Sequence, residues 1–175
     1  DIKTYVGIGV EEPASTVRLD FTIWGFHAMV LSPKGSFFID PYNNRTTDHY
    51  ISYYKKDFTK NESDRMICRV GDDMATSMPY VSEAAEFVGD CGIRHEYRLA
   101  LACTGEYTEY HGNTVAGAQA AMVTTMNRVN GVFEKDCAVR MIIIGNNNLI
   151  IYTDGATDPY SNGSPGVMIG QNQTN

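Results

Sequence analysis

The chain has 175 residues, of which 43% are hydrophobic and 20% charged, and its formal net charge is −7. This length suffices for one globular domain or two small ones, and the many aromatic and β-branched residues exclude a predominantly disordered chain. The longest apolar runs are far shorter than the roughly 20 residues that cross a membrane. We therefore expect no membrane span. Because the chain is acidic and has no basic cluster, we also expect no nucleic-acid partner.

Cysteine and asparagine patterns bear on the compartment of the protein. None of the four cysteines forms a C-x-x-C motif, which excludes a local zinc ribbon, and their spacing leaves every disulfide pairing open. Four N-x-S/T triplets, compatible with a secreted protein, begin at Asn44, Asn61, Asn162 and Asn172. The chain begins at Asp1 without an initiator methionine or a signal peptide, so we expect a processed or excised segment.

Residues 2–58 carry the pattern of a β-sheet. Apolar and polar side chains alternate through residues 17–23, which is typical of a half-buried strand with Arg18 and Asp20 on its polar face. Further strands are predicted at 26–31 and 36–40, on either side of a Ser-Pro-Lys-Gly turn, and in the aromatic run at 50–54. No helix pattern is visible in this region.

The rest of the chain has a different pattern. After a polar connector at about 59–92, we predict a strand at 97–104, an amphipathic helix at 114–133 that begins at Asn113 or Thr114, and a strand at 138–144 buried on both faces. This order predicts a parallel β-α-β unit. A further strand is expected at 149–152, and residues 153–175 show no closing element, so the domain is expected to be incomplete.

No pair of histidines has the i, i+4 spacing of a zinc-binding helix. His95 and Glu96 begin an H-E-x-x-H pattern, but Leu99 stands where the second histidine belongs. We expect His111 to be a loop or capping residue and His27 to pack in a strand. Carboxylates at strand ends suit acid–base chemistry, although solvated surface groups are the commoner use of such residues: Glu106, Glu109, Asp154 and Asp158.

Several segments resemble the reprolysin-like zinc metallopeptidases, which are metzincins related to the adamalysins and ADAM proteases, here of the bacterial secreted kind. The segments similar to the start of their catalytic domain are 97–108 (YRLALACTGEYT), 114–118 (TVAGA), 124–132 (TTMNRVNGV) and 151–154 (IYTD). Those similar to the preceding propeptide are 25–29 (GFHAM), 38–42 (FIDPY) and 50–55 (YISYYK). The resemblance implies an α+β chain in which a β-rich propeptide region with its connector, 1–92, precedes the N-terminal portion of the catalytic domain, 93–175.

The resemblance further implies a secreted zinc metalloendopeptidase that is made as a zymogen and cleaves peptides or proteins. In that family a zinc-bound water attacks the scissile carbonyl with a glutamate as general base. The zinc-binding motif H-E-x-x-H-x-x-G-x-x-H is absent from this sequence, so we expect no catalytic residue, no zinc and no activity in this chain alone. Its expected partner, after cleavage, is the remainder of the catalytic domain.

Related propeptides block the zinc with a cysteine thiolate, and Asp90-Cys91-Gly92 resembles the core of such a switch. The alternative for Cys91 is a structural disulfide or a buried thiol. An alternative for the whole chain is a non-catalytic extracellular module on a degenerate protease scaffold, whose β region offers Tyr42, Tyr50, Tyr53 and Tyr54 for glycan or protein contact.

Overall fold

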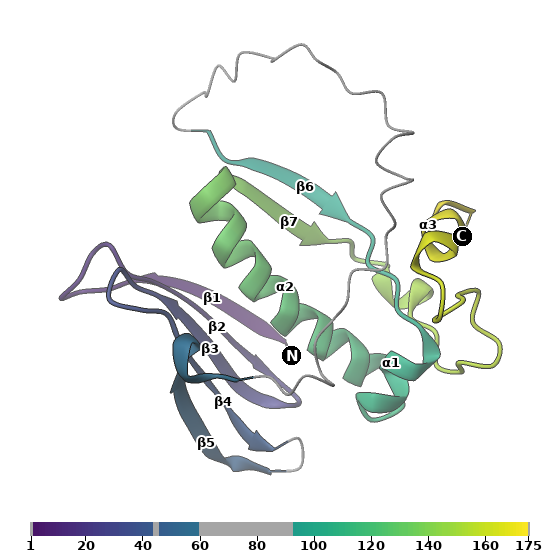
Figure 1. Ribbon diagram of the computed structural model, residues 1–175, viewed down its shortest axis with the longest axis horizontal. Coiled ribbons are helices and arrows are strands. Elements are labelled where there is room, and N and C mark those ends of the chain that lie inside the picture. The colour runs from purple at the N-terminus through teal and green to yellow at the C-terminus, as the bar shows by residue number, and fades with distance from the viewer. Residues whose placement is uncertain (1, 44–45, 60–92, 175) are drawn as a thin grey trace. The chain divides into compact units, whose positions relative to one another are not determined.

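The first sheet is an antiparallel meander. The computed structural model describes residues 2–43, 46–59 and 93–174, and within these ranges the residues up to 59 and from 94 to 158 form one compact unit. In this unit the strands of the first sheet pair in chain order (Figure 1): β1 (Lys3–Ile8), β2 (Thr16–Thr22), β3 (Gly25–Leu31), β4 (Phe37–Asn43) and β5 (Thr46–Tyr54). The strands predicted in this region are confirmed, and one turn of 3-10 helix, η1 (Lys55–Asp57), follows β5.

The predicted turn between β3 and β4 is also confirmed. The amide of Gly35 donates a hydrogen bond to the carbonyl of Ser32 at 3.0 Å. Gly35 has a φ of +127°, a backbone conformation that side chains with a Cβ rarely adopt. Glycine at the last position of this turn therefore determines where the hairpin closes.

The face of β2 that is buried is the opposite of the one that its pattern implies. Arg18 and Asp20 are only 8% and 1% exposed, whereas Phe21 is 50% exposed. The prediction of a half-buried strand is therefore confirmed, but the implied burial of its apolar face is wrong. The reason is that a long helix, α2, lies against the polar face and supplies bonding partners for both charged side chains.

The second half of the unit is the predicted parallel β-α-β arrangement. β6 (His95–Leu99) pairs with β7 (Val139–Ile143) in parallel, and α1 (Gly105–Tyr110) and α2 (Val115–Cys137) connect them. Thr114 caps α2 as predicted, since its side chain accepts a hydrogen bond from the amide of Gly117 at 3.0 Å. In Figure 1, α2 lies between the two sheets and contacts β2 on one side and β7 on the other.

Several local predictions in this half are wrong. The strand predicted to run to residue 104 ends at Leu99, and α1 forms where a connection was expected. β7 is not buried on both faces, because Ile142 is 44% exposed. The strand expected at 149–152 is largely replaced by a 3-10 turn, η4 (Asn147–Ile150), and only a single bridge joins Ile151 to Cys103.

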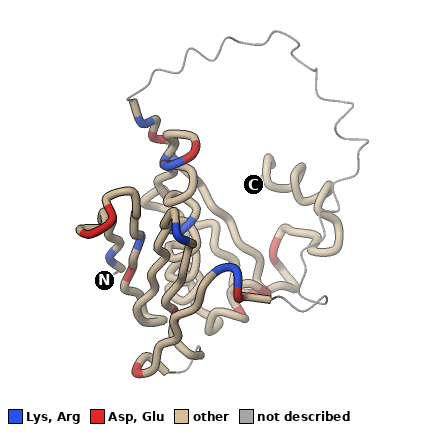
Figure 2. Tube along the Cα trace, turned by 60° about the vertical axis from the view of Figure 1, so that its left-hand side comes forward, with Lys and Arg blue, Asp and Glu red and all other residues tan. Residues whose placement is uncertain are grey.

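The tail also differs from its prediction. Residues 165–174, where no element was expected, form a helix, α3 (Pro165–Thr174), which carries no charged side chain (Figure 2). The tail folds on itself, since Gln171 accepts a hydrogen bond from the amide of Ser161 at 3.0 Å. In the part of the chain that the structure describes, no helix combines the length and apolarity that a membrane crossing requires.

Two buried asparagines hold the β-α-β unit together. Asn147 is fully buried; its side chain accepts a hydrogen bond from the amide of Leu101 at 2.8 Å and donates one to the carbonyl of Leu101 at 3.0 Å. Asn130 of α2 pairs in the same way with the amide and carbonyl of Met141 in β7, both at 2.8 Å. A small apolar core made of Cys103, Ala118, Met122 and Ile151 packs in this unit, and its Met122 lies beside Asn147.

Replacing Ala138 with glycine should raise the free energy of unfolding. Ala138 ends α2 in the left-handed conformation, with φ 54° and ψ 33°. Relief of this strain, less the entropy that glycine loses on folding, should stabilise the protein by roughly 0.5 to 1 kcal/mol. The urea midpoint measures it, and Ala116→Gly on the exposed side of α2 should instead cost about 1 kcal/mol. If the urea midpoint shifted equally in Ala138→Gly and Ala116→Gly, the left-handed capping conformation of Ala138 would be contradicted.

Candidate functional site

The candidate site is the contact between the first sheet and α2, because this contact concentrates buried charged groups. The α2 residues that meet the sheet recur along one side of the helix: Gly117, Thr124, Arg128, Gly131 and Glu134. At Gly131 an added Cβ would lie 2.7 Å from Cε of Met29 and 2.9 Å from Cγ of Arg18. Glycine at this position therefore permits the helix to approach the strands closely.

The first charged contact joins Arg18 of β2 to Glu134 of α2. The two side chains form an ion pair and are only 9% and 16% exposed. Arg140 of β7 approaches the same carboxylate, with its Nε 3.6 Å from Oε1 of Glu134. Glu134 therefore lies between an arginine of each sheet.

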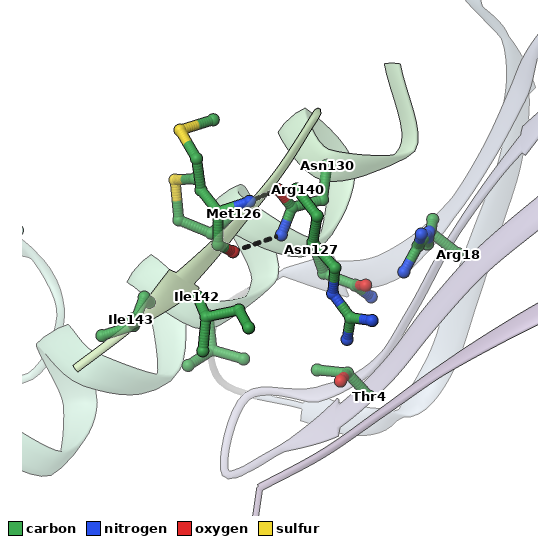
Figure 3. A pocket seen from close by; sticks show the side chains of 10 residues that line it. Thr4, Arg18, Met126, Asn127, Asn130, Arg140, Ile142 and Ile143 are labelled. Atoms are coloured by element: carbon green, nitrogen blue, oxygen red, sulfur yellow. Dashed lines mark hydrogen bonds between the residues drawn. The ribbon is translucent and has the colours of Figure 1, made fainter. Parts of the chain in front are cut away.

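A cavity of about 160 Å³ lies beside this ion pair. Figure 3 shows Arg18 of β2, Asn127 of α2, Arg140 of β7 and Thr4 of β1 around this cavity. The negative charge of Glu134 already balances part of the positive charge here. The cavity therefore belongs to the contact between the sheets and α2, and both polar and apolar side chains line it.

The second contact is built around Asp20 of β2. Its carboxylate accepts a hydrogen bond from Oγ1 of Thr124 at 3.0 Å, and Nδ1 of His27 lies 3.5 Å from Oδ2. Burial raises the pKa of Asp20, and burial lowers the pKa of His27. Both shifts have the same physical cause, the removal of a charged form from water.

The third contact joins Asp40 of β4 to Arg128 of α2. The two form an ion pair, and the guanidinium of Arg128 also lies 5.3 Å from the ring centre of Phe38. Tyr53 of β5 donates a hydrogen bond from its hydroxyl to Oδ2 of Asp40 at 2.8 Å. Burial and this bond to a carboxylate raise the pKa of Tyr53 to about 12.

Trp24 contacts α2 near the start of the helix, at the end of the sheet contact away from Glu134. It lies between β2 and β3, and its indole Nε1 donates to the carbonyl of Gly117 at 2.9 Å. A second cavity, of about 340 Å³, is lined by Trp24, His27, Arg128, Tyr107 and His111, among others. Burial lowers the pKa of His111.

The residues singled out from sequence have mostly structural positions. His111 is the C-cap of α1, and its amide donates to the carbonyls of Tyr107 and Thr108. His95 begins β6 and is exposed, and His27 packs beside Asp20, as expected of a strand residue. The structure does not bring these three histidines together as ligands: among the residues described, no three His, Cys, Asp or Glu side chains form a group that could hold a metal ion.

The carboxylates at the strand ends stabilise a loop. Oδ2 of Asp158 accepts the amide of Gly105 at 2.7 Å, and Oδ1 of Asp154 accepts the amide of Ala156 at 2.9 Å. Glu106 lies against the same loop, at Gly155, and Glu109 is exposed. These contacts give Asp154 and Asp158 a role in loop geometry.

The described cysteines take no part in the contact. Cys103 is buried and Cys137 is exposed, and they are not bonded to each other. The thiol of Cys103 lies 3.3 Å from the hydroxyl of Thr108, and burial raises the pKa of this thiol. Cys91, the predicted switch cysteine, lies outside the described residues, as does Cys68.

Sequence reasoning missed the sheet and helix contact. Its only signal was the placing of charged side chains on the polar face of β2 and along α2, which is also the pattern of solvated surfaces. Arg18 and Glu134 are 116 positions apart, and no local rule connects such residues.

Comparison with known proteins bears on the second half of the chain. The model of the family described as metallo-peptidase family M12B, reprolysin-like, matches residues 93–173. No curated protein and no solved structure matches the chain. The matched residues include β6, α1, α2 and β7, the elements that form the parallel unit. The resemblance of the segments between residues 97 and 154 is thereby confirmed: residues 93–173 are similar to the reprolysin-like metallopeptidases.

Proposed function

We propose that this chain is the propeptide and the first part of the catalytic domain of a secreted zinc metalloendopeptidase. The observation that carries the proposal is the family match at 93–173, supported by the parallel β6 and β7 that it spans. The substrates of the complete enzyme are peptides or proteins. In this proposal residues 93–175 contribute the scaffold of the domain, and the boundary with the leader at residues 92 and 93 stays a prediction.

The proposed leader is the region up to residue 92. Its support is the way in which the first sheet binds α2, a helix of the matched segment, through Arg18, Asp20 and Asp40. A leader has to hold its enzyme and later leave it, and contacts made of charged pairs suit that use better than a shared apolar core. Cys91 remains a candidate zinc ligand of this leader.

Zinc is assigned to the complete enzyme. The sequence contains no H-E-x-x-H-x-x-G-x-x-H, and the side chains in the described ranges do not fit a zinc site. The proposal therefore places the metal ligands and the general base in polypeptide outside this sequence, and it derives no catalytic step from the residues present.

The test compares this chain with a longer natural precursor. Purified alone, the chain should bind no stoichiometric zinc by elemental analysis and should cleave no denatured protein substrate. The precursor, once its leader is removed, should show peptidase activity that a chelator abolishes. Chelator-sensitive cleavage by this chain alone, with one zinc bound, would refute the proposal.

A second candidate, a non-catalytic binding module, is favoured by the outward face of the first sheet. Tyr50 and Tyr54 are 43% and 49% exposed there, beside Phe21 at 50%. Tyr53 lies on the opposite face, bonded to Asp40, and takes no part. The intact mass of the natural protein separates the candidates, because a precursor that includes a metal-binding helix supports the protease and a natural end at Asn175 supports the module.

A further inference from the structure

The outward face of the first sheet, the side away from α2 (Figure 1), is apolar across its five strands. The strand register arranges its side chains in rows that cross the sheet. The middle row is Tyr5, Leu19, Ala28, Ile39 and Ser52. The row on one side of it is Gly7, Val17, Val30, Phe37 and Tyr54, and the row on the other side includes Lys3, Phe21, Phe26 and Tyr50. Among these residues Lys3 alone is charged, in contrast to the face that α2 covers.

The heights of the rows make this face complementary to a copy of itself. The middle row has short side chains at Ala28 and Ser52, whereas aromatic pairs stand on either side of it. The ring centres of Phe21 and Phe26 are 4.9 Å apart, and those of Phe37 and Tyr54 are 6.0 Å apart. A two-fold axis presents the same rows on a second copy, so the rings of each copy can pack over the short side chains of the other.

The face is also large enough for a stable pair. It measures about 24 Å in each direction, because its strands lie about 4.8 Å apart and a seven-residue strand such as β2 rises about 3.4 Å per residue. Two copies that cover this face on each other remove roughly 1,100 Å² of surface from water, which exceeds the area of about 1,000 Å² that a specific interface needs. A single sugar ring or one peptide strand would leave most of the face exposed.

Charge favours a second copy over the other occupants. The net charge of −7 makes two copies repel each other, but the outward rows carry no acidic side chain, so contact through them keeps the acidic groups at a distance. The same net charge disfavours an anionic lipid surface. A glycan site needs several polar groups to orient the sugar, and here Ser52 and the tyrosine hydroxyls are the polar groups between apolar side chains.

We propose that two copies of this chain associate through the outward face of the first sheet, packed face to face about a two-fold axis. This is the face that favours the second candidate function, and the inference assigns it to a copy of the same chain. Obligate homodimer interfaces are the more apolar class of protein interface, as this face is.

Sedimentation velocity of the full chain tests the proposal over about 1 to 100 μM, a range that covers dissociation constants typical of weak to moderate interfaces. The wild-type chain should sediment at twice its mass of 19.4 kDa at the upper end and dissociate on dilution. Added sodium chloride should tighten the association, because it screens the repulsion between two copies of charge −7 and breaks no ion pair in an apolar contact.

Phe21→Glu should raise the dissociation constant of the pair by at least about 100-fold, because each pair acquires two carboxylates within an apolar contact. Tyr5→Glu, at a second position of the face that is 48% exposed, should act in the same direction. The matched control is Leu149→Glu, which places the same acid at a 72% exposed apolar site in η4, and it should leave the dissociation constant unchanged. Circular dichroism confirms that each variant is folded.

Several outcomes would overturn the proposal. One is a wild-type chain that stays monomeric over the whole range, and others are a pair that neither Phe21→Glu nor Tyr5→Glu weakens and a pair that salt dissociates. Assemblies that keep growing with concentration would indicate edge pairing of β1 or β5 and also overturn it. A monomer that binds phosphatidylcholine vesicles or a glycan array would assign the face to that occupant instead. If Phe21→Glu fails to fold, Tyr5→Glu decides. The measurements require neither zinc nor peptidase activity, so failure of the proposed function leaves them separate.

Discussion

Gly105→Ala is expected to lower the free energy of unfolding by about 3 kcal/mol, at the upper end of the usual cost of overpacking. Gly105 is the first residue of α1, and its amide donates to Asp158 at 2.7 Å. A Cβ at this position would lie 2.0 Å from the amide nitrogen of Gly155 and 2.2 Å from the carbonyl carbon of Asp154. These are backbone atoms, so the 153–158 loop itself has to move.

Urea unfolding followed by Trp24 emission and by circular dichroism measures this change. Gly145→Ala is the matched control, because a Cβ there meets nothing within 4 Å, and its effect should stay within about 0.5 kcal/mol. If the two variants unfold at the same urea concentration, the loop does not pack against α1 as the structure has it.

The second large effect is expected for Asn147→Ala. This side chain is fully buried and bonds both the amide and the carbonyl of Leu101, so alanine leaves two backbone groups without partners. An unsatisfied buried group costs about 1 to 3 kcal/mol, and we expect a total loss of about 3 kcal/mol. The segment between β6 and α1 would lose its attachment to η4.

The neighbouring Asn148 gives a control of identical chemistry. Its side chain is exposed, so Asn148→Ala should change the free energy of unfolding by less than about 0.5 kcal/mol. Hydrogen exchange at the amide of Leu101 adds a local measurement, because this amide should lose protection in Asn147→Ala only. Retained protection there would mean that Asn147 is not the partner of this amide.

Much of the fold could be predicted from the sequence because local physics determines it. The alternation in β2, glycine at the end of the 32–35 turn and the capped apolar stripe of α2 are each readable within a few residues. The predicted order of strand, helix and strand led directly to the parallel pairing of β6 and β7.

The parts that could not be predicted depend on distant partners or on short elements. Alternation in β2 shows two faces but not which one a helix will cover, so the burial of Arg18 and Asp20 became visible only when Glu134 and Thr124 were placed beside them. α1 spans six residues, too few for a periodic pattern. Near η4 the side chain of Asn147 bonds both the amide and the carbonyl of Leu101, where the apolar run alone predicted a strand at 149–152.

The candidate site, too, has features that could be read from the sequence and features that depend on distant partners. The family resemblance predicted for residues 93–175 agrees with the family match at 93–173, because it rests on specific segments such as 97–108 and 124–132. It identified no functional side chain in the described part of the chain. The sheet and helix contact arises from pairs more than 80 positions apart, such as Arg128 with Asp40, and these require a tertiary structure to be seen.

The pairing of Asn130 with Met141 determines where the smaller sheet is able to grow. Its side chain occupies the amide and carbonyl at the middle of β7 on the edge away from β6. A strand approaching that edge would have to displace the asparagine before it formed a continuous ladder. Enlargement of this sheet by another strand is therefore directed to the edge of β6 that faces away from β7.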